Sequence, residues 1–134
     1  MPSTEEVVSL FERLAEGWQE RKDTDKDLSA YRNRVEKPEP APLFQDLDAL
    51  LDYHQRRLEY VQGLQMRKEA NANAVADYED AAERLVGVLP QGSHVYYDYQ
   101  GTRKDLRGTR FTIENRHAKI MVLDVVGSTG SSPA

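Results

Sequence analysis

The chain has 134 residues and a formal net charge of −5, with 39% hydrophobic and 31% charged residues. This length suits one domain, and the composition predicts a small core with long helices that each bury one apolar stripe. The absence of cysteine excludes disulfides, thiolate zinc sites and cysteine nucleophiles. No run of about 18 uncharged apolar residues is present, and the N-terminus leads into acidic sequence, which indicates neither a membrane span nor a secretory signal. We therefore expect a cytoplasmic protein that does not bind membranes.

The first predicted element is a helix over residues 4–36. Ser3-Thr4-Glu5-Glu6 is a capping box, in which the Ser3 hydroxyl accepts a hydrogen bond from the Glu6 N–H. Apolar residues then follow at helical spacing, at Val7, Leu10, Phe11, Leu14 and Trp18. The pattern weakens over residues 23–25, where an interruption of the helix is an open alternative. Three alternating prolines in residues 37–42 end the helix and form a stiff connector.

A second helix is predicted over residues 43–89, a segment without proline. The apolar seam along it includes positions that we expect to join two copies of the chain, with His54 as a polar residue that sets the register. The candidate oligomer seam consists of Leu47, Leu50, His54, Val61, Leu64 and Val75.

Residues 93–126 change character and predict a three-stranded antiparallel β-meander. The segments 94–99 and 110–114 alternate β-branched and aromatic residues with polar ones, as half-buried strands do. Residues 120–126 are apolar on both faces except at Asp124, so we expect this strand to be covered on both sides and not to be a free edge. The Gly- and Ser-rich residues 127–134 predict a disordered tail.

These elements predict an α+β fold, mostly helical, in a single domain over residues 1–126. The helix 4–36 folds back as an antiparallel, coiled-coil-like hairpin and covers residues 43–75, since paired helices have equal rise per residue. The sheet then packs on the uncovered end of the long helix, at Tyr78, Ala81, Ala82, Leu85 and Leu89. A two-helix hairpin buries little apolar surface, so we expect a homo-oligomer, most simply a dimer.

No catalytic, metal or cofactor site is predicted. Residues 23–27 carry the alternating carboxylates of a calcium loop, but Leu28 stands in place of its glycine and Arg34 in place of its glutamate. His54, His94 and His117 are far apart in the sequence and lack a zinc-ligand pattern. Ser93 beside His94 is no catalytic arrangement, and a small enzyme is the weakest of three hypotheses.

Two partial resemblances are visible, and neither one assigns the chain to a family. The carboxylates around the connector, at Glu36, Glu39, Asp46 and Asp48, followed by a β segment, resemble the layout of bacterial transcript-cleavage factors. Leu50-Leu51-Asp52-Tyr53-His54-Gln55 looks like a segment of crescent-shaped membrane-bending helical domains. Those domains use basic concave faces, which this acidic chain lacks.

The β segment has the most function-like composition. Residues 1–90 hold 12 basic and 19 acidic residues, a net charge of −7, whereas residues 91–134 hold 6 and 4, a net charge of +2. Aromatic and basic side chains are interleaved there, as in base-stacking and phosphate-binding surfaces. The candidate residues for binding a protein partner or nucleic acid are Tyr96, Arg103, Lys104, Arg107, Arg110, Arg116 and Lys119.

The leading hypothesis is a non-enzymatic oligomeric assembly or adaptor protein. Its helical hairpin mediates self-association, and its small sheet binds a protein partner that the sequence does not identify. The alternative is a nucleic-acid-associated protein that binds phosphate through the basic residues 103–110 and an exposed Tyr96.

Overall fold

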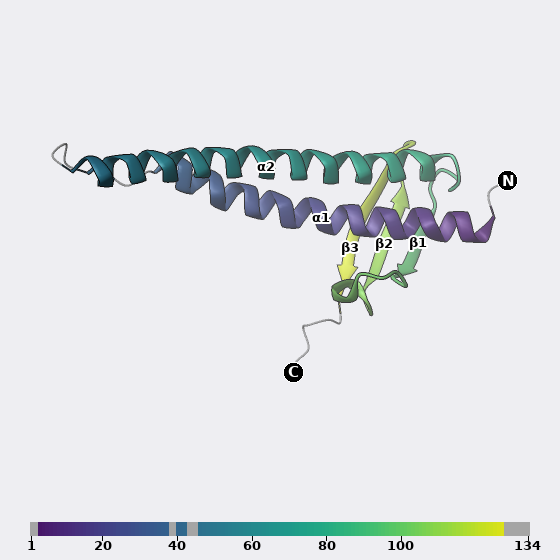
Figure 1. Cartoon of the computed structure of the whole chain (residues 1–134). Helices are drawn as coiled ribbons and strands as arrows, with labels where there is room; N and C mark the ends of the chain where they lie inside the picture. Colours follow the sequence, from purple (N-terminus) through teal and green to yellow (C-terminus); the bar gives the residue numbers. More distant parts are fainter. Residues whose placement is uncertain (1–2, 38–39, 43–45, 128–134) are drawn as a thin grey trace. The chain divides into compact units, whose positions relative to one another are not determined.

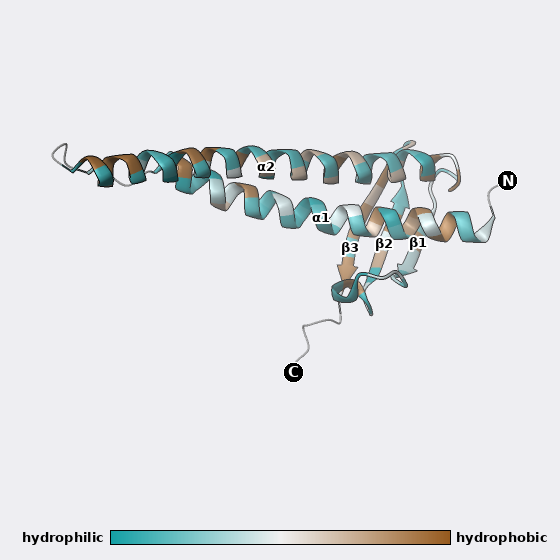
Figure 2. Cartoon of the chain, in the orientation of Figure 1, coloured by the Kyte–Doolittle hydropathy of each residue, from teal (hydrophilic) through white to brown (hydrophobic). Residues whose placement is uncertain are grey.

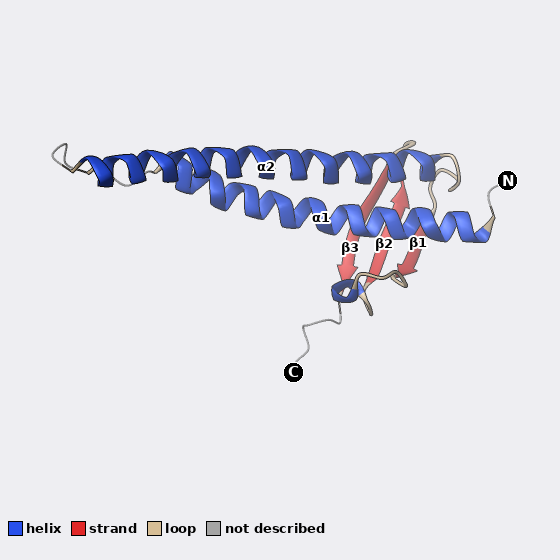
Figure 3. Ribbon diagram, viewed as in Figure 1, coloured by secondary structure: helices blue, strands red, loops and turns tan. Residues whose placement is uncertain are grey.

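The computed structural model describes residues 3–37, 40–42 and 46–127. Two helices, α1 (Thr4–Glu36) and α2 (Leu47–Val86), precede a three-stranded antiparallel sheet (Figures 1 and 3). This arrangement confirms the α+β, mostly helical fold. The chain divides into two compact units, residues 1–19 with 75–134 and residues 20–74, which we call the sheet unit and the helical unit. Part of the predicted connector (38–39) and most of the predicted tail (128–134) lie outside the described residues, and the single-domain assignment stays a prediction.

Helix α1 begins and ends at the predicted residues. The Glu6 N–H donates to the Ser3 hydroxyl at 3.1 Å, as the capping box requires. The interruption considered at residues 23–25 is wrong, because α1 is continuous from Thr4 to Glu36. The Thr24 hydroxyl donates to the Glu20 carbonyl, 2.7 Å away, and this local bond fits inside an unbroken helix.

Helix α2 is shorter than predicted at its C-terminal end. Asp46 caps its start, since the Asp46 carboxylate accepts from the Ala49 N–H at 3.0 Å. Of the predicted first residues, 43–45 lie outside the described residues. The helix ends at Val86, three residues before Leu89, because the chain turns at Gly87 and continues to Pro90. Glycine at this position is a common helix terminator.

The sheet contains β1 (His94–Asp98), β2 (Arg110–Asn115) and β3 (Ile120–Val126) in the order β1-β2-β3. A short 3-10 helix, η1 (Lys104–Leu106), lies in the connection between β1 and β2. The meander is therefore confirmed, and β3 has its predicted bounds. Pairing shifts between Thr112 and Ile113, which lie opposite Asp124 and Val122, so Leu123 is the extra residue of a β-bulge.

The main hydrophobic core lies in the sheet unit. The inward face of the sheet contributes Tyr97, Phe111, Ile113 and Ile120, and the predicted contacts from α2 are present, with Leu85 fully buried. Helix α1 also packs on this core, which the sequence analysis did not predict. Its contributions to the core cluster are Val8, Leu10, Phe11, Leu14, Ala15 and Trp18.

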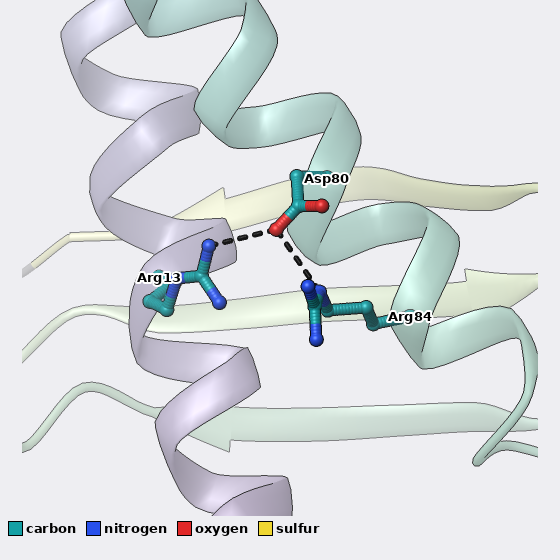
Figure 4. A network of polar contacts seen from close by, with 3 residues as sticks. All are labelled: Arg13, Asp80 and Arg84. Atoms are coloured by element: carbon teal, nitrogen blue, oxygen red, sulfur yellow. Dashed lines mark hydrogen bonds and ion pairs between the residues drawn. The ribbon is translucent and has the colours of Figure 1, made fainter.

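The two helices run antiparallel in each unit, but their predicted register is wrong. In the sheet unit, Asp80 accepts from Arg13 at 2.8 Å and also pairs with Arg84 (Figure 4). In the helical unit, Arg57 donates to the carbonyl of Val35 at 3.2 Å. Helix α1 thus lies opposite α2 residues from 57 onward, not opposite 43–75. Leu47, the first residue of α2, lies ten residues before Arg57, so α2 begins before the position that meets the end of α1.

The β2–β3 hairpin turn contains a strained position that can be tested. His117 (φ 54°) and Ala118 (φ 59°) both adopt the left-handed conformation, and Arg116 and Lys119 exchange two backbone hydrogen bonds across them. Ala118 is exposed, and its Cβ makes the left-handed backbone conformation unfavourable. We expect Ala118→Gly to raise the free energy of unfolding by about 1 kcal/mol in denaturant melts. The control Ala72→Gly, at an exposed position inside α2, should lower the free energy of unfolding by about 1 kcal/mol. If both changes destabilise the protein, the backbone at Ala118 is not strained.

Candidate interaction surfaces

The contact between α1 and α2 in the helical unit is largely polar. The Asn71 side-chain amide donates to the Thr24 hydroxyl at 3.0 Å and to the Asp25 carboxylate at 2.8 Å. The Arg67 guanidinium lies 4.0 Å from the centre of the Tyr31 ring and pairs with Asp27. Hydrogen bonds and exposed ion pairs add little net free energy, so this contact holds the two helices together more weakly than an aliphatic core would.

The residues of the candidate oligomer seam differ in their exposure. Arg67, which is not among the candidate seam residues, lies on the face of α2 that meets α1. Of the candidate oligomer seam, Leu50, Leu64 and Val75 are half-buried, whereas Leu47, His54 and Val61 are exposed. The six candidates therefore lie on two faces of α2. Sequence periodicity alone does not separate these two faces, because all six positions lie within an arc of about 100° around the helix axis.

An aliphatic stripe is exposed on α2 at the start of the helix. Leu47, Leu51, His54, Leu58 and Val61 follow at alternating spacings of four and three residues, which places them on one face. The exposed fractions of the four aliphatic side chains are 63%, 67%, 51% and 49% in chain order. Because α1 meets α2 from Arg57 onward, the first half of the stripe lies beyond the end of α1 (Figures 1 and 2).

The predicted basic surface is divided between the two ends of β2. Arg103, Lys104, Arg107 and Arg110 lie before or at its start, and Arg116 and Lys119 lie after its end. Six residues of strand separate the two groups by about 20 Å. Three of the cations are already paired: Arg103 with Asp105, Arg110 with Asp98, and Arg116 with Glu114. The sheet therefore does not collect these charges into one patch.

Tyr96 is exposed on the outward face of β1, as the alternation predicts, with 65% of its surface accessible. The Arg110 guanidinium lies 5.7 Å from the centre of its ring, and the His94 ring centroid lies 5.7 Å away. Arg110 also contacts both carboxylate oxygens of Asp98, at 2.7 and 3.2 Å. This pairing lowers the pKa of Asp98 and keeps its carboxylate ionised.

The hydroxyl of Tyr99, directly after β1, forms hydrogen bonds that connect α1 to the sheet. This contact was not predicted from the sequence. The Tyr99 hydroxyl donates to the Glu16 carboxylate at 2.5 Å and accepts from the Arg103 N–H at 3.0 Å. Burial, followed by the bond to Glu16, raises the pKa of Tyr99 to about 12. The signal available in the sequence was Glu16 between buried Leu14, Ala15 and Gly17, a carboxylate close to the apolar face of an amphipathic helix.

Groups of metal-ligand side chains and surface hollows are the features that would support an active site. The described residues contain no group of three or more His, Cys, Asp or Glu side chains that could hold a metal ion. A hollow of about 400 Å³ after α2 is lined by residues 86–91 with Asn115 and Ala118, none of them titratable, whereas a hollow of about 590 Å³ beside the start of α1 is lined by Glu5, Glu6 and Arg84 among others. Within the described part of the chain, neither helix has the length and apolar content needed to span a membrane.

Comparisons with protein-family models, curated proteins and solved structures found no match for this chain.

Proposed function

We propose that the protein is a non-enzymatic, cytoplasmic assembly or adaptor protein that associates with itself through the exposed stripe on α2. Its two helices act as a coiled-coil-like hairpin, and its sheet presents Tyr96 and the neighbouring charges to a protein partner. The observation that carries the proposal is the stripe: four aliphatic side chains, each about half or more exposed, on one helix face.

Two features of the helical unit support a second copy as the occupant of this stripe. The aliphatic residues of the stripe have nearly the same spacing on both sides of His54. An antiparallel copy can therefore place aliphatic side chains opposite aliphatic side chains. The bond from Arg57 to the Val35 carbonyl sets the end of α1 ten residues after the start of α2, so the start of α2 extends past α1, and a short isolated helix is marginal in water. Burial of the stripe against a second copy removes both apolar surface and helix end from water.

The test is the mass of the full chain in solution at micromolar concentration. We expect the wild type to sediment as at least a dimer of the 15.3 kDa chain. Leu51→Glu with Leu58→Glu places two charges in the stripe and should lower the mass at least twofold while far-UV circular dichroism keeps its helical signal. The control Met66→Glu with Ala70→Glu adds the same charges at exposed positions about 100° or more around the helix from Leu47 and should leave the mass unchanged.

A wild type that sediments as a 15.3 kDa monomer and unfolds cooperatively would contradict the proposal. An unchanged mass for the Leu51→Glu, Leu58→Glu protein would contradict it as well, because the stripe would then not be the contact.

Nucleic-acid binding is the second candidate, favoured by the exposed Tyr96 ring beside the Arg110 guanidinium. Within the described residues, Lys104 and Arg107 also carry charges that no carboxylate neutralises. Phosphate binding predicts retention on immobilised nucleic acid that falls with salt, and a further loss in Lys104→Ala with Arg107→Ala. Lys26→Ala with Lys68→Ala removes the same charge from the helical unit and should retain binding. Absence of salt-dependent retention would exclude this candidate.

A further inference from the structure

Strand β3 lies at an edge of the sheet in the isolated chain, and the expected cover for this edge from a second copy stays a prediction. The order β1-β2-β3 gives β3 one neighbour, and the side chains of Leu123 and Val126 are 39% and 60% exposed. Six of its seven residues are apolar, and the strand contains neither proline nor lysine. Protein sheets usually protect an edge with such residues, because unpaired N–H and C=O groups attract another strand.

We propose that β3 is a second self-association surface, which pairs with β3 of another copy and continues the sheet from one chain into the next. This inference rests on the proposed self-association through α2. The strand and the stripe lie in different units of the chain, so the two contacts use separate residues.

The charge pattern favours an antiparallel pair of β3 strands. Asp124 is the single charged residue of the strand. In an antiparallel pair centred on Leu123, each Asp124 lies opposite Val122 of the other copy, whereas a parallel pair in register would place the two carboxylates side by side. The bulge at Leu123 and the bond from the Val125 N–H to the Asp124 carboxylate (2.9 Å) interrupt the middle of the edge, so pairing is expected to be moderate in strength.

The size of the α2 stripe also argues for a second contact between copies. Full burial of a leucine removes on the order of 100 Å² of apolar surface, so four half-exposed aliphatic side chains supply roughly 250 Å². A stable interface buries about 800 Å² on each partner. The stripe covers two heptads, fewer than a stable coiled coil normally uses, and the exposed apolar surface of β3 adds to the total.

Two separate two-fold contacts on one chain have a consequence for the assembly. A chain that joins one copy through α2 and another through β3 forms a closed tetramer or an open filament, not a dimer. Each contact also raises the effective concentration for the other. We therefore expect the wild type to be larger than a dimer.

Sedimentation of the full chain and three variants tests this inference. Leu123→Lys with Val126→Lys should reduce the wild-type assembly to at most a dimer, joined by α2. Leu51→Glu with Leu58→Glu should also give at most a dimer, joined by β3, and the four changes together should give a monomer. The control His94→Lys with Tyr96→Lys places the same charges at exposed positions of the opposite edge strand, β1, and should keep the wild-type mass.

The two proposals fail in different ways. A wild-type mass for the Leu123→Lys, Val126→Lys protein would overturn pairing through β3 and leave the α2 contact in place. A wild-type mass for the stripe variant would overturn the α2 contact instead. Hydrogen exchange of the wild type tests the proposal without any variant that could misfold. Amides of residues 120–126 should become at least tenfold more protected as the protein concentration rises through the association range. Unchanged protection would overturn the proposal.

Discussion

Leu85→Ala is expected to lower the free energy of unfolding by about 2–4 kcal/mol. The Leu85 side chain has no exposed surface and belongs to the cluster in which α2, α1 and the sheet meet. Its removal loses the transfer free energy of the buried methyl groups and leaves a cavity among rigid neighbours such as Phe111 and Ile113. The sheet has three short strands and depends on this packing for its stability.

Denaturant melts with a matched substitution on the same helix provide the check. Met66 is 68% exposed, so Met66→Ala should change the free energy of unfolding by less than about 0.5 kcal/mol. The contrast is evaluated at one protein concentration, because association shifts the apparent stability of an oligomer. Similar costs for the two substitutions would mean that the sheet does not dock on α2 at Leu85.

Elements marked by local signals were predictable from the sequence. The capping box at Ser3 and the prolines after Glu36 bound α1, and the β-branched run of β3 has the observed bounds. These signals act within a few residues and need no knowledge of the partner. The weak pattern around Thr24 misled the prediction because Asn71, 47 residues away, supplies a polar partner there.

Features that depend on long-range register were not predictable. The position of α1 along α2 depends on contacts between residues far apart in the sequence, such as Arg57 with Val35 and Arg13 with Asp80, and helical periodicity does not specify these pairs. As a result, the expectation that the sheet packs on α2 alone was incomplete, because α1 lies over the same core. The bulge at Leu123 also changes which side chains share a face of the sheet. Val122 and Val125 both pack on the core, whereas strict alternation would place Val122 on the same face as Asp124.

The candidate surface was predicted in part for the same reason. Exposure of Tyr96 follows from alternation within one strand, a local property. Neutralisation of Arg110 by Asp98 depends on the pairing of β1 with β2, which sets these two residues directly opposite each other. A count of basic residues in the sequence could not show that three of six were paired.

Tyr99→Phe is expected to destabilise the protein at neutral pH by about 1–3 kcal/mol. The hydroxyl of this buried residue joins Glu16 on α1 to the backbone N–H of Arg103. Phenylalanine fills the same space but leaves the carboxylate and the N–H without this partner, which is costly in a half-buried site. The double role of the hydroxyl, donor to one group and acceptor from the other, is unavailable to any apolar replacement.

The same bond predicts how stability changes at alkaline pH. A tyrosine in the unfolded chain loses its proton near pH 10, whereas the pKa of Tyr99 in the folded protein is about 12. Because the folded pKa is the higher one, the stabilising contribution is complete below pH 10 and is lost as the pH rises through 12. The stability difference between wild type and Tyr99→Phe, measured in denaturant melts, should therefore narrow by on the order of 2 kcal/mol between pH 9.5 and 12.

Two comparisons make this alkaline effect specific to Tyr99. Burial also raises the pKa of Tyr97, but Tyr97 is present in both proteins and its contribution cancels in the difference. Tyr96→Phe removes a hydroxyl from an exposed side chain and should differ from the wild type by less than about 0.5 kcal/mol across the whole range. If the difference in unfolding free energy between the wild type and Tyr99→Phe stays constant from pH 9.5 to 12, the Tyr99 hydroxyl is not held in its protonated form by burial and Glu16.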